Sequence, residues 1–317
     1  MNIKKSKYYI TFRRIYFKTQ NNIYFYFQKI RNKRIIKENL KENVFAIEIY
    51  THMGMGANLV WALEIFAFCN EKGLTPQIKF THLNSKQKGD YFGEYFEIRN
   101  SFTSNQNRRF AKMRIFNDLN LGLKWNYNER LNLELVDELI KKYLIIKDNI
   151  LNEVDAFERK HFFNKNVLGV HYRGTDKKRE AKQITYETVL KSISLYLAKY
   201  PETNCVFVSS DESKFINYIE NSDIDCKVVY YNDSFRSSDN LPIHTVNNNL
   251  YEINKDGLVN CLLLSRCNTL IKTPSLLSDW SVLFNPSIRL ILLGKPYDRY
   301  TFFPGKEFYK SVLYESI

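Results

Sequence analysis

Val167-Leu-Gly-Val-His-Tyr-Arg-Gly-Thr-Asp-Lys177 is the stretch of sequence that decides the fold. Its apolar start predicts a buried strand, and His171 and Arg173 follow on one face of that strand. Gly174 then turns the chain into a short polar cluster. Ligands of open α/β sheets bind at the carboxyl edge, where this strand would deliver its arginine. A guanidinium fork fits two phosphate or carboxylate oxygens, so we expect a phosphate compound, with a surface ion pair of Arg173 as the alternative.

The segment from Asn204 to Phe215 repeats the order of strand, polar tip and helix. Residues 205–208 are a continuous apolar run, and Ser209-Ser210-Asp211 follow where the strand would end. We expect a helix after this tip, through Tyr218. Asp211 would reach the same sheet edge, unless it or Ser210 only caps that helix.

A third unit runs from Asp256 to Trp280. It predicts a helix with an apolar stripe, a short strand over residues 269–272 and a new helix that begins at Leu276. Proline just before that helix suits its first turn. The unpaired N–H groups there, together with the Ser275 hydroxyl, would form an anion site. Three such tips in one half of the chain predict one pocket for a nucleoside diphosphate.

These three segments resemble the three motifs of the GDP-fucose-dependent fucosyltransferase superfamily, which includes the α1,6-, nodulation and protein O-fucosyltransferases. Residues 169–177 look like the first motif, Gly-Val-His-x-Arg-Arg-Thr-Asp-Lys, residues 206–211 like the second and residues 257–278 like the third. The likeness is good over the C-terminal half and poor over the N-terminal half. It implies a glycosyltransferase of GT-B-like α/β fold, with two facing Rossmann-like domains and the nucleotide on the C-terminal one.

The resemblance also assigns catalytic roles near the first motif. Arg173 would hold the β-phosphate and stabilise the charge on the departing diphosphate. Asp176 and Lys177 would brace the loop or contact the phosphates. Glu180 is the candidate for the general base, although it lies one residue earlier than the corresponding glutamate of the family.

The donor-binding residues that the resemblance implies come from all three motifs. His171 would lie beside the nucleotide, and Asp211 would belong to the second tip. Thr273 and Ser275 would bind pyrophosphate oxygens.

Two positions depart from the family pattern. Gly174 stands where the family has a second arginine, so one phosphate or loop contact is missing or supplied from elsewhere. Asn260 stands where the family has an aspartate that accepts from guanine, and an amide offers one acceptor and adds a donor. Asp256 lies one helical turn earlier and is a candidate replacement. The identity of the base is therefore less firmly predicted than the phosphate site.

The N-terminal half contains a glycine-rich turn. Residues 44–50 predict a strand, and Thr51-His-Met-Gly-Met-Gly-Ala-Asn58 leads into an apolar helix over residues 59–70. Gly54 and Gly56 would let the backbone approach a ligand closely, and Asn58 would cap the helix or contact the donor. This turn resembles the glycine-rich loop of the same superfamily. Gly-x-Gly by itself would also fit any tight turn from a strand into a helix. Residues 84–110 are expected to form long loops and are candidates for holding the acceptor.

The pattern of short strands and helices predicts a division into three parts. Residues 1–42 are a basic, aromatic N-terminal extension. Residues 43–155 form an N-terminal α/β domain on the acceptor side, and residues 156–317 form the C-terminal domain that binds the nucleotide sugar.

Positive charge is concentrated at the start of the chain. Residues 1–42 hold twelve Lys or Arg and two Glu, a balance of +10 out of +13 for all 317 residues. Basic residues interleaved with aromatic rings suit an anionic membrane surface. Contact with nucleic acid is a less favoured interpretation because the rest of the chain is nearly neutral. A solvated helix or strand packed on the body is the plain alternative.

The five cysteines contain no Cys-x-x-Cys pair, which favours a reducing compartment. No apolar run is long enough to span a bilayer, and charges near the start argue against a cleaved signal peptide. We therefore expect a cytoplasmic protein that binds peripherally to the inner face of a membrane.

No His, Cys or carboxylate cluster has the spacing of metal ligands, and Asp223-Ile-Asp225 only mimics the Asp-x-Asp of another glycosyltransferase architecture. We expect neither a metal nor a cofactor. The predicted reaction is inverting transfer of L-fucose from GDP-fucose to a glycan hydroxyl. Another GDP-sugar, a deoxysugar or a heptose used in surface polysaccharide synthesis, is the first alternative. An RNA- or membrane-binding module is the non-enzyme alternative.

Overall fold

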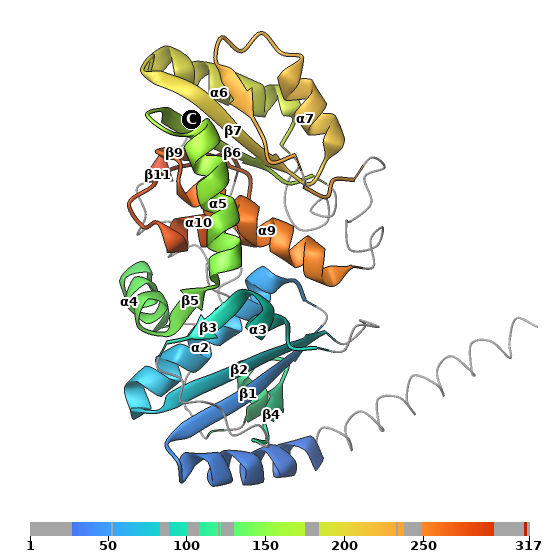
Figure 1. Ribbon diagram of the computed structural model, residues 1–317, viewed down its shortest axis with the longest axis vertical. Coiled ribbons are helices and arrows are strands. Elements are labelled where there is room, and N and C mark those ends of the chain that lie inside the picture. Colours follow the sequence, from blue (N-terminus) through green and yellow to red (C-terminus); the bar gives the residue numbers. More distant parts are fainter. Residues whose placement is uncertain are drawn as a thin grey trace, which may run out of the picture.

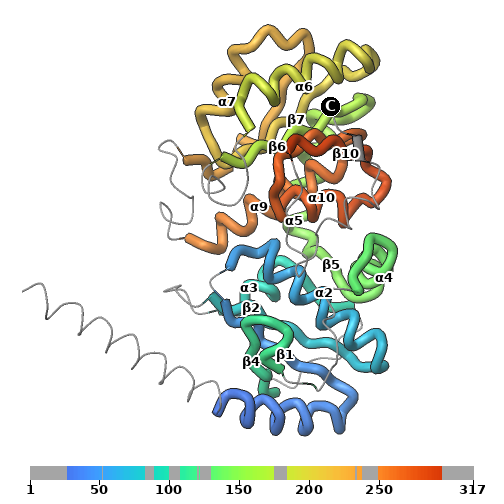
Figure 2. The backbone as a smooth tube through the Cα atoms, turned by 180° about the vertical axis from the view of Figure 1, so that it is seen from behind, coloured from blue at the N-terminus to red at the C-terminus, as the bar shows by residue number. Residues whose placement is uncertain are grey.

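The computed structural model shows two α/β halves stacked along the long axis of the molecule (Figures 1 and 2). Each half is built around a parallel sheet. The structure describes residues 27–51, 53–82, 89–99, 108–119, 121, 130–174, 184–232, 234–237, 249–294 and the backbone of 314–315.

The N-terminal half contains a three-stranded parallel sheet in the order β2-β1-β4. Its strands are β1 (Val44–Thr51), β2 (Thr75–His82) and β4 (Ala111–Met113). Helix α2 (Met55–Lys72) connects β1 to β2 and ends at Gly73, whose left-handed φ of 66° suits glycine. The strand predicted over residues 44–50 is confirmed. The following helix begins earlier than predicted, since Gly54 is its N-cap.

Two short elements lie where long loops were expected. Residues 91–98 form α3 (Tyr91–Tyr95) and β3 (Phe96–Ile98), and β3 pairs antiparallel with β5 (Leu144–Ile146). The expectation of a continuous loop over residues 84–110 was therefore wrong in this part. Phe92 and Phe96 are buried and pack against each other with tilted rings 5.4 Å apart, so tertiary packing outweighs the weak local pattern. The remaining described elements of this half are η1 (Phe116–Leu119) and α4 (Leu133–Tyr143).

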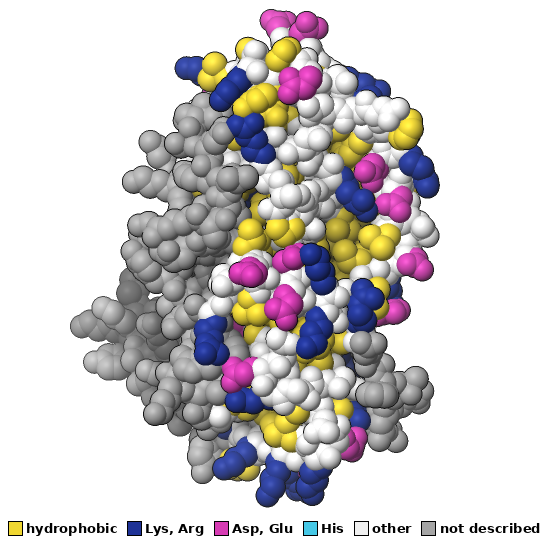
Figure 3. Space-filling view, turned by 90° about the vertical axis from the view of Figure 1, so that its left-hand side faces the viewer, with side chains coloured by type: hydrophobic (Ala, Val, Ile, Leu, Met, Phe, Trp, Pro, Cys, Tyr) yellow, Lys and Arg dark blue, Asp and Glu magenta, His cyan; other side chains and the backbone are white. Residues whose placement is uncertain are grey.

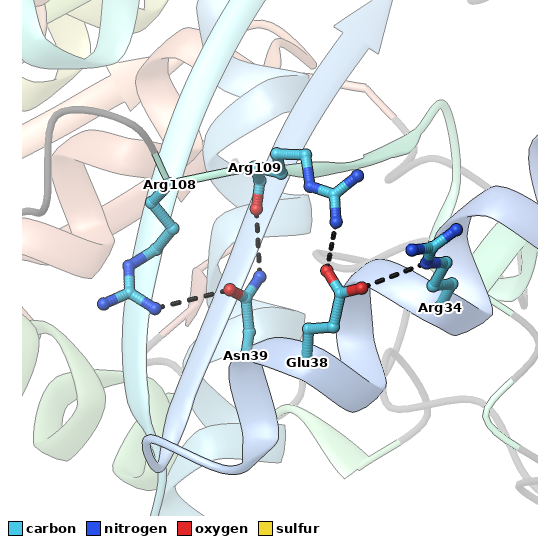
Figure 4. A network of polar contacts seen from close by, with 5 residues as sticks. All are labelled: Arg34, Glu38, Asn39, Arg108 and Arg109. Carbon is cyan, nitrogen blue, oxygen red and sulfur yellow. Dashed lines mark hydrogen bonds and ion pairs between the residues drawn. The ribbon is translucent and has the colours of Figure 1, made fainter.

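The helix of residues 27–40 packs along the open edge of the N-terminal sheet. Asn32 lies against Lys112 of the edge strand, where its Nδ2 donates to the Lys112 carbonyl at 2.7 Å and its Oδ1 accepts from the Lys112 N–H at 2.9 Å. Asn39 likewise donates to the Arg109 carbonyl at 3.0 Å (Figure 4). Asn32 thus satisfies backbone groups that an edge strand leaves unpaired, and Asn39 binds the segment that leads into the strand. The helix is therefore an integral part of the N-terminal half.

The C-terminal half holds a six-stranded sheet in the order β11-β10-β9-β6-β7-β8, and every adjacent pair is parallel. From β6 the chain moves outward through β7 and β8, then returns and moves outward on the other side through β9, β10 and β11. The direction therefore reverses between β6 and β9, which is the switch point of a Rossmann-like sheet. The strands are β6 (Asn166–Tyr172), β7 (Thr203–Ser210), β8 (Lys227–Val229), β9 (Thr269–Lys272), β10 (Arg289–Leu292) and β11 (Tyr314–Glu315).

Helices cover both faces of this sheet. One face carries α6 (Tyr186–Lys199) and α7 (Ser213–Glu220), whose apolar residues share a core with Leu168 and Val170 of β6. The other face carries α5 (Asp148–His161), α9 (Leu250–Ser265) and α10 (Leu276–Phe284). Their core is continuous with that of the N-terminal half.

The two halves also meet through polar contacts. The Tyr95 hydroxyl donates to the Tyr251 carbonyl at 2.8 Å, and the two rings stack at 5.4 Å. Trp280 Nε1 donates to the Gly56 carbonyl at 3.0 Å. The predicted boundary at residue 155 falls within α5, and the division into three parts stays a prediction. Among the described residues, no helix combines the length and apolarity that a bilayer span requires.

Candidate active site

The candidate site is built on the carboxyl ends of β6 and β9, the two strands at the switch point. The Thr273 N–H donates to the His171 carbonyl at 3.0 Å, which extends the pairing of the strands past the end of β9. The Thr273 hydroxyl then accepts from the Arg173 N–H at 3.0 Å. Two of the predicted motifs are thus joined directly, because the sheet places their strands side by side.

Arg173 is held at this edge by the tip of β7. Asp211 Oδ1 accepts from the Gly174 N–H at 3.2 Å, and Asp211 Oδ2 lies 3.9 Å from Arg173 Nε. The Arg173 side chain is 28% exposed, so it lies at the rim of the sheet and is mostly covered. Helix α7 takes Glu212 as its N-cap, which rules out the simple capping role considered for Ser210 and Asp211. Asp211 instead orients the Arg173 loop.

Ser275 and His171 present buried polar atoms to this edge. Ser275 is 1% exposed and is the N-cap of α10, yet its hydroxyl makes no capping bond. Within the described part of the chain, neither Ser275 Oγ nor His171 Nδ1 has a hydrogen-bond partner. Buried groups of this kind usually have a partner, so each one calls for a structural reason. For the Ser275 hydroxyl, an oxygen of a bound ligand would be such a partner.

His171 lies in an environment that disfavours its charged form. Burial lowers its pKa well below the ordinary value, and the cations of Lys272 and Arg173 lower the pKa further. The imidazole is therefore neutral near pH 7 and leaves the positive charge of the site to Arg173.

A buried ion pair beneath the site was missed in the sequence. Lys272, the last residue of β9, is fully buried and pairs with Asp279 of α10. Its Nζ also donates to the Ser275 carbonyl at 3.2 Å. Burial lowers the Lys272 pKa, and Asp279 opposes this effect. The pair fixes the start of α10 relative to the strand that precedes it. A lysine that ends an apolar strand was the only signal for it in the sequence.

The glycine-rich turn of the N-terminal half lies against the start of α10. A Cβ placed on Gly56 would be 3.4 Å from Leu276 Cβ and 3.6 Å from Trp280 Cδ1. Gly54 has no atom within 4 Å of such a position and is exposed. The turn is therefore next to Ser275, as an opposite wall of the site would be.

Asn58 forms hydrogen bonds within the glycine-rich turn. The Thr51 hydroxyl donates to Asn58 Oδ1 at 2.9 Å, and Asn58 Nδ2 donates to the Met53 carbonyl at 3.4 Å. The expected role as helix cap does not apply, because Gly54 is the N-cap. Contact of Asn58 with the donor stays a prediction.

Asn260 belongs to a separate polar network. Its Nδ2 donates to Ser234 Oγ at 2.8 Å and to Asp256 Oδ1 at 2.8 Å. Asp256 also accepts from Ser234 Oγ at 2.8 Å and from the Phe235 N–H at 3.2 Å. Burial raises the pKa of Asp256 from 3.8 to about 6, although these bonds lower it. Both residues thus tie α9 to the loop after β8, and neither bonds directly to the Arg173 cluster.

Glu212 occupies the space beside Gly174. A Cβ on Gly174 would lie 2.4 Å from Glu212 Oε1, and the Tyr186 hydroxyl donates to Glu212 Oε2 at 2.6 Å. Burial raises the Tyr186 pKa, and the bond to Glu212 raises it further. A buried carboxylate therefore stands where the side chain of the family's second arginine would begin.

Three predicted residues, Asp176, Lys177 and Glu180, lie outside the described part of the chain, so their roles stay predictions. Among the residues that are described, no group of three or more His, Cys, Asp or Glu is arranged to hold a metal ion. A hollow of about 880 Å³ lies between α5, β8 and α9. Its lining contains Asp256, the candidate replacement for the family's guanine-binding aspartate, but neither Arg173, Thr273 nor Ser275. The hollow therefore adjoins the Asn260 network and not the strand tips of the candidate site.

No protein family model matches this sequence, and no curated protein sequence matches it. Solved structures do match. NodZ alpha-1,6-fucosyltransferase co-crystallized with GDP has 17% identity and a TM-score of 0.52, over 80% of this chain and 95% of that chain. The chain shares the fold of NodZ. The predicted α/β, GT-B-like fold class is confirmed by this likeness, which at such identity concerns the fold alone.

Two further matches have similar coverage. NodZ from Bradyrhizobium is 18% identical, with a TM-score of 0.49, over 78% of this chain and 94% of that chain. POFUT1 in complex with GDP-fucose is 11% identical, with a TM-score of 0.49, over 78% of this chain and 98% of that chain.

Proposed function

We propose that the protein is an inverting, metal-independent glycosyltransferase that transfers L-fucose from GDP-fucose to a glycan hydroxyl. The observation that carries the proposal is the meeting of Arg173, Thr273 and Ser275 at the switch point of the C-terminal sheet. This is the place where open α/β sheets bind nucleotides. The resemblance of the same residues to the fucosyltransferase motifs supports the choice of donor.

The diphosphate would bind between Arg173 and the start of α10. The guanidinium offers paired donors to two phosphate oxygens. The unpaired N–H groups of the first turn of α10 and the Ser275 hydroxyl would bind the others. Because α10 is anchored by the buried Lys272–Asp279 pair, these donors are prearranged before the donor substrate arrives.

The reaction would be a single displacement. The acceptor oxygen attacks the anomeric carbon on the face opposite the diphosphate, while the carbon–oxygen bond to the diphosphate breaks. The acceptor proton passes to a carboxylate, for which Glu180 remains the predicted base. Arg173 stabilises the negative charge that develops on the departing GDP. Attack from the opposite face inverts the anomeric configuration.

The network around Asn260 bears on recognition of the guanine base, which every GDP-sugar shares, and not on the identity of the sugar. This residue donates to Ser234 and Asp256, and Asp256 already accepts from three protein groups. Two of these bonds go to Oδ1 and one to Oδ2, so the described contacts leave Asp256 one acceptor position, on Oδ2, for a base. The alternative is transfer of another GDP-sugar, a deoxysugar or a heptose, in the synthesis of a surface polysaccharide. We propose the cytoplasm as the place of the reaction, because the five cysteines are free.

Thermal unfolding in the presence of nucleotides tests the proposal. GDP, UDP, CDP and ADP would each be added to the wild type, Arg173→Ala, Arg173→Lys and Ser275→Ala. We expect GDP to raise the Tm of the wild type most and to have little effect on Arg173→Ala. Lysine keeps the charge but loses the fork, so Arg173→Lys should restore only part of the effect. Ser275→Ala removes a buried hydroxyl that has no described partner, so it should weaken GDP binding without lowering the Tm of the ligand-free protein.

Release of GDP from GDP-fucose in the presence of glycan acceptors would then measure the reaction itself. Stabilisation by UDP alone would rule out both GDP-sugar donors. A lack of response to every diphosphate, in a wild type that unfolds cooperatively, would instead favour a binding module.

A further inference from the structure

Four lysines form a row along the helix of residues 27–40 and the turn that follows it. Lys29, Lys33, Lys37 and Lys41 are spaced four residues apart, and all four are exposed. Residues at this spacing are neighbours on a helix surface, and like charges there destabilise the helix. None of the four forms an ion pair with another described residue. Within the described part of the chain, no carboxylate therefore offsets the repulsion along this row.

The orientation of this helix is fixed by its opposite face. Ile35 and Ile36 are buried, Asn32 bonds to the backbone of the edge strand, and Asn39 bonds to the Arg109 carbonyl just before that strand. Glu38 forms ion pairs with Arg34 of the same helix and with Arg109 of the segment before β4 (Figure 4). The lysine row consequently faces outward.

Large apolar side chains accompany the lysines. Phe27 is 63% exposed, Ile30 is 53% exposed and Leu40 is 39% exposed. In the described part of the chain, the other exposed large apolar residues are scattered over other elements. Cations interleaved with apolar groups on a helix face are typical of contact with a bilayer surface, where lysines meet anionic headgroups and apolar groups enter the boundary with the acyl chains.

The place of the helix in the molecule suits such a contact. It lies at the end remote from the C-terminal sheet (Figure 1), and Lys and Arg side chains gather at that end in the space-filling view (Figure 3). Residues 1–42 carry +10 of the net charge of +13. We propose that the outer face of the helix of residues 27–40 docks on an anionic lipid bilayer. This contact would leave the donor site of the C-terminal half facing the aqueous phase, and it does not depend on which donor is used.

A bilayer accounts for the face better than RNA does. Single-stranded RNA is bound by a positive groove with aromatic platforms for the bases. This face is the outer surface of a helix and carries one described aromatic side chain, Phe27. Ile30 and Leu40 offer no platform for a base, but both can enter a lipid interface.

Flotation of the full chain with vesicles tests the proposal. Vesicles of phosphatidylcholine with phosphatidylglycerol should bind the wild type, vesicles of phosphatidylcholine alone should not, and high salt should weaken binding. Each lysine near such a surface strengthens binding by about fivefold. The triple variant Lys33→Gln, Lys37→Gln, Lys41→Gln should therefore bind about a hundredfold more weakly. Glutamine keeps the helix propensity of lysine, so folding should be preserved.

The matched control removes three exposed lysines at the opposite end of the molecule. Lys191→Gln and Lys199→Gln on α6, with Lys214→Gln on α7, change the net charge equally and should leave vesicle binding unchanged. Ile30→Ser should weaken the part of the binding that resists salt.

Three results would overturn the proposal. One is that the wild type does not bind the anionic vesicles. Another is that the lysine triple variant binds them as well as the control triple does, since residues 1–26 would then account for the contact. The third is displacement of the protein from vesicles by polyuridine, with loss of polyuridine binding in the same triple variant, because the face would then belong to nucleic acid.

Discussion

The position of Arg173 depends on groups that are distant in the sequence. The Thr273 hydroxyl accepts from the Arg173 N–H, and the Asp211 carboxylate accepts from the Gly174 N–H. Both acceptors lie just past the ends of other strands, β9 and β7. Gly174, the residue after Arg173, makes room for the Glu212 carboxylate. The family motif has a second arginine, and so a second cation, at the position of Gly174. This chain instead has the buried Glu212 carboxylate beside that position, and it accepts from the Tyr186 hydroxyl. The surroundings of Arg173 are accordingly less positive than the family motif alone suggests.

Replacement of Gly174 by alanine tests this arrangement. The new Cβ would lie 2.4 Å from Glu212 Oε1, so a buried and hydrogen-bonded carboxylate would have to move. We expect Gly174→Ala to lower the free energy of unfolding by about 1–3 kcal/mol, measured in urea. In a Glu212→Ala background the same change should cost little, since the clash is gone. Equal costs in both backgrounds would contradict this account of Gly174.

An ion pair and a set of hydrogen bonds fix two helices of the C-terminal half, α10 and α9. Helix α10 is held by the buried pair of Lys272 and Asp279. Helix α9 is held by Asp256, which accepts from Ser234 and Phe235 of the loop after β8 and from Asn260 of its own helix. Burial of these groups makes both the ion pair and the hydrogen bonds costly to break. The start of α10 can therefore present Ser275 in one place.

Asp256 should also make stability depend on pH. Its pKa is raised from 3.8 to about 6, so the folded protein keeps this proton in a range where the unfolded chain has lost it. The folded state binds more protons there, and stability from this group must fall as pH rises. Between about pH 4 and pH 6, we expect the wild type to lose about 2 kcal/mol relative to Asp256→Asn. Urea unfolding of both proteins across this range measures the difference, and parallel pH profiles would contradict the assignment.

At the scale of the whole molecule, the candidate site lies where the two halves touch. The glycine-rich turn before α2 meets the start of α10 through Trp280 and Leu276. The Tyr95–Tyr251 contact joins the halves at a second point. A core continuous across the junction supports these contacts. A ligand bound at Ser275 would therefore lie close to backbone from both halves.

Gly54→Ala separates a role in binding from a role in folding. Gly54 has a φ of −69°, which alanine adopts without strain, and no atom lies near the added Cβ. The change should leave stability equal or raise it by up to about 1 kcal/mol. If the turn faces the donor, the affinity for GDP-fucose measured by calorimetry should fall about tenfold, equivalent to about 1.4 kcal/mol. Gly89→Ala, which also meets no described atom, is the control and should bind normally. An unchanged affinity of Gly54→Ala for GDP-fucose would show that the turn is not part of the donor site.

The local pattern of the sequence was sufficient for several elements of the site. The strand over residues 269–272, the helix start at Leu276 and the strand before Arg173 are all confirmed. Apolar runs and turn residues are local signals, and buried parallel strands display them clearly. The expected loop at residues 91–98 failed because aromatic packing, a tertiary effect, decided the structure there.

By itself, the sequence determined that strands end in polar tips carrying Arg173, Asp211 and Ser275, and that positive charge is concentrated at the start of the chain. Only the tertiary structure decided which tips meet, since the order of strands places β9 beside β6 across about a hundred intervening residues. It also placed Glu212 beside Gly174 and turned the lysine row outward. These outcomes depend on contacts between distant residues, and such contacts leave no periodic signal in the chain.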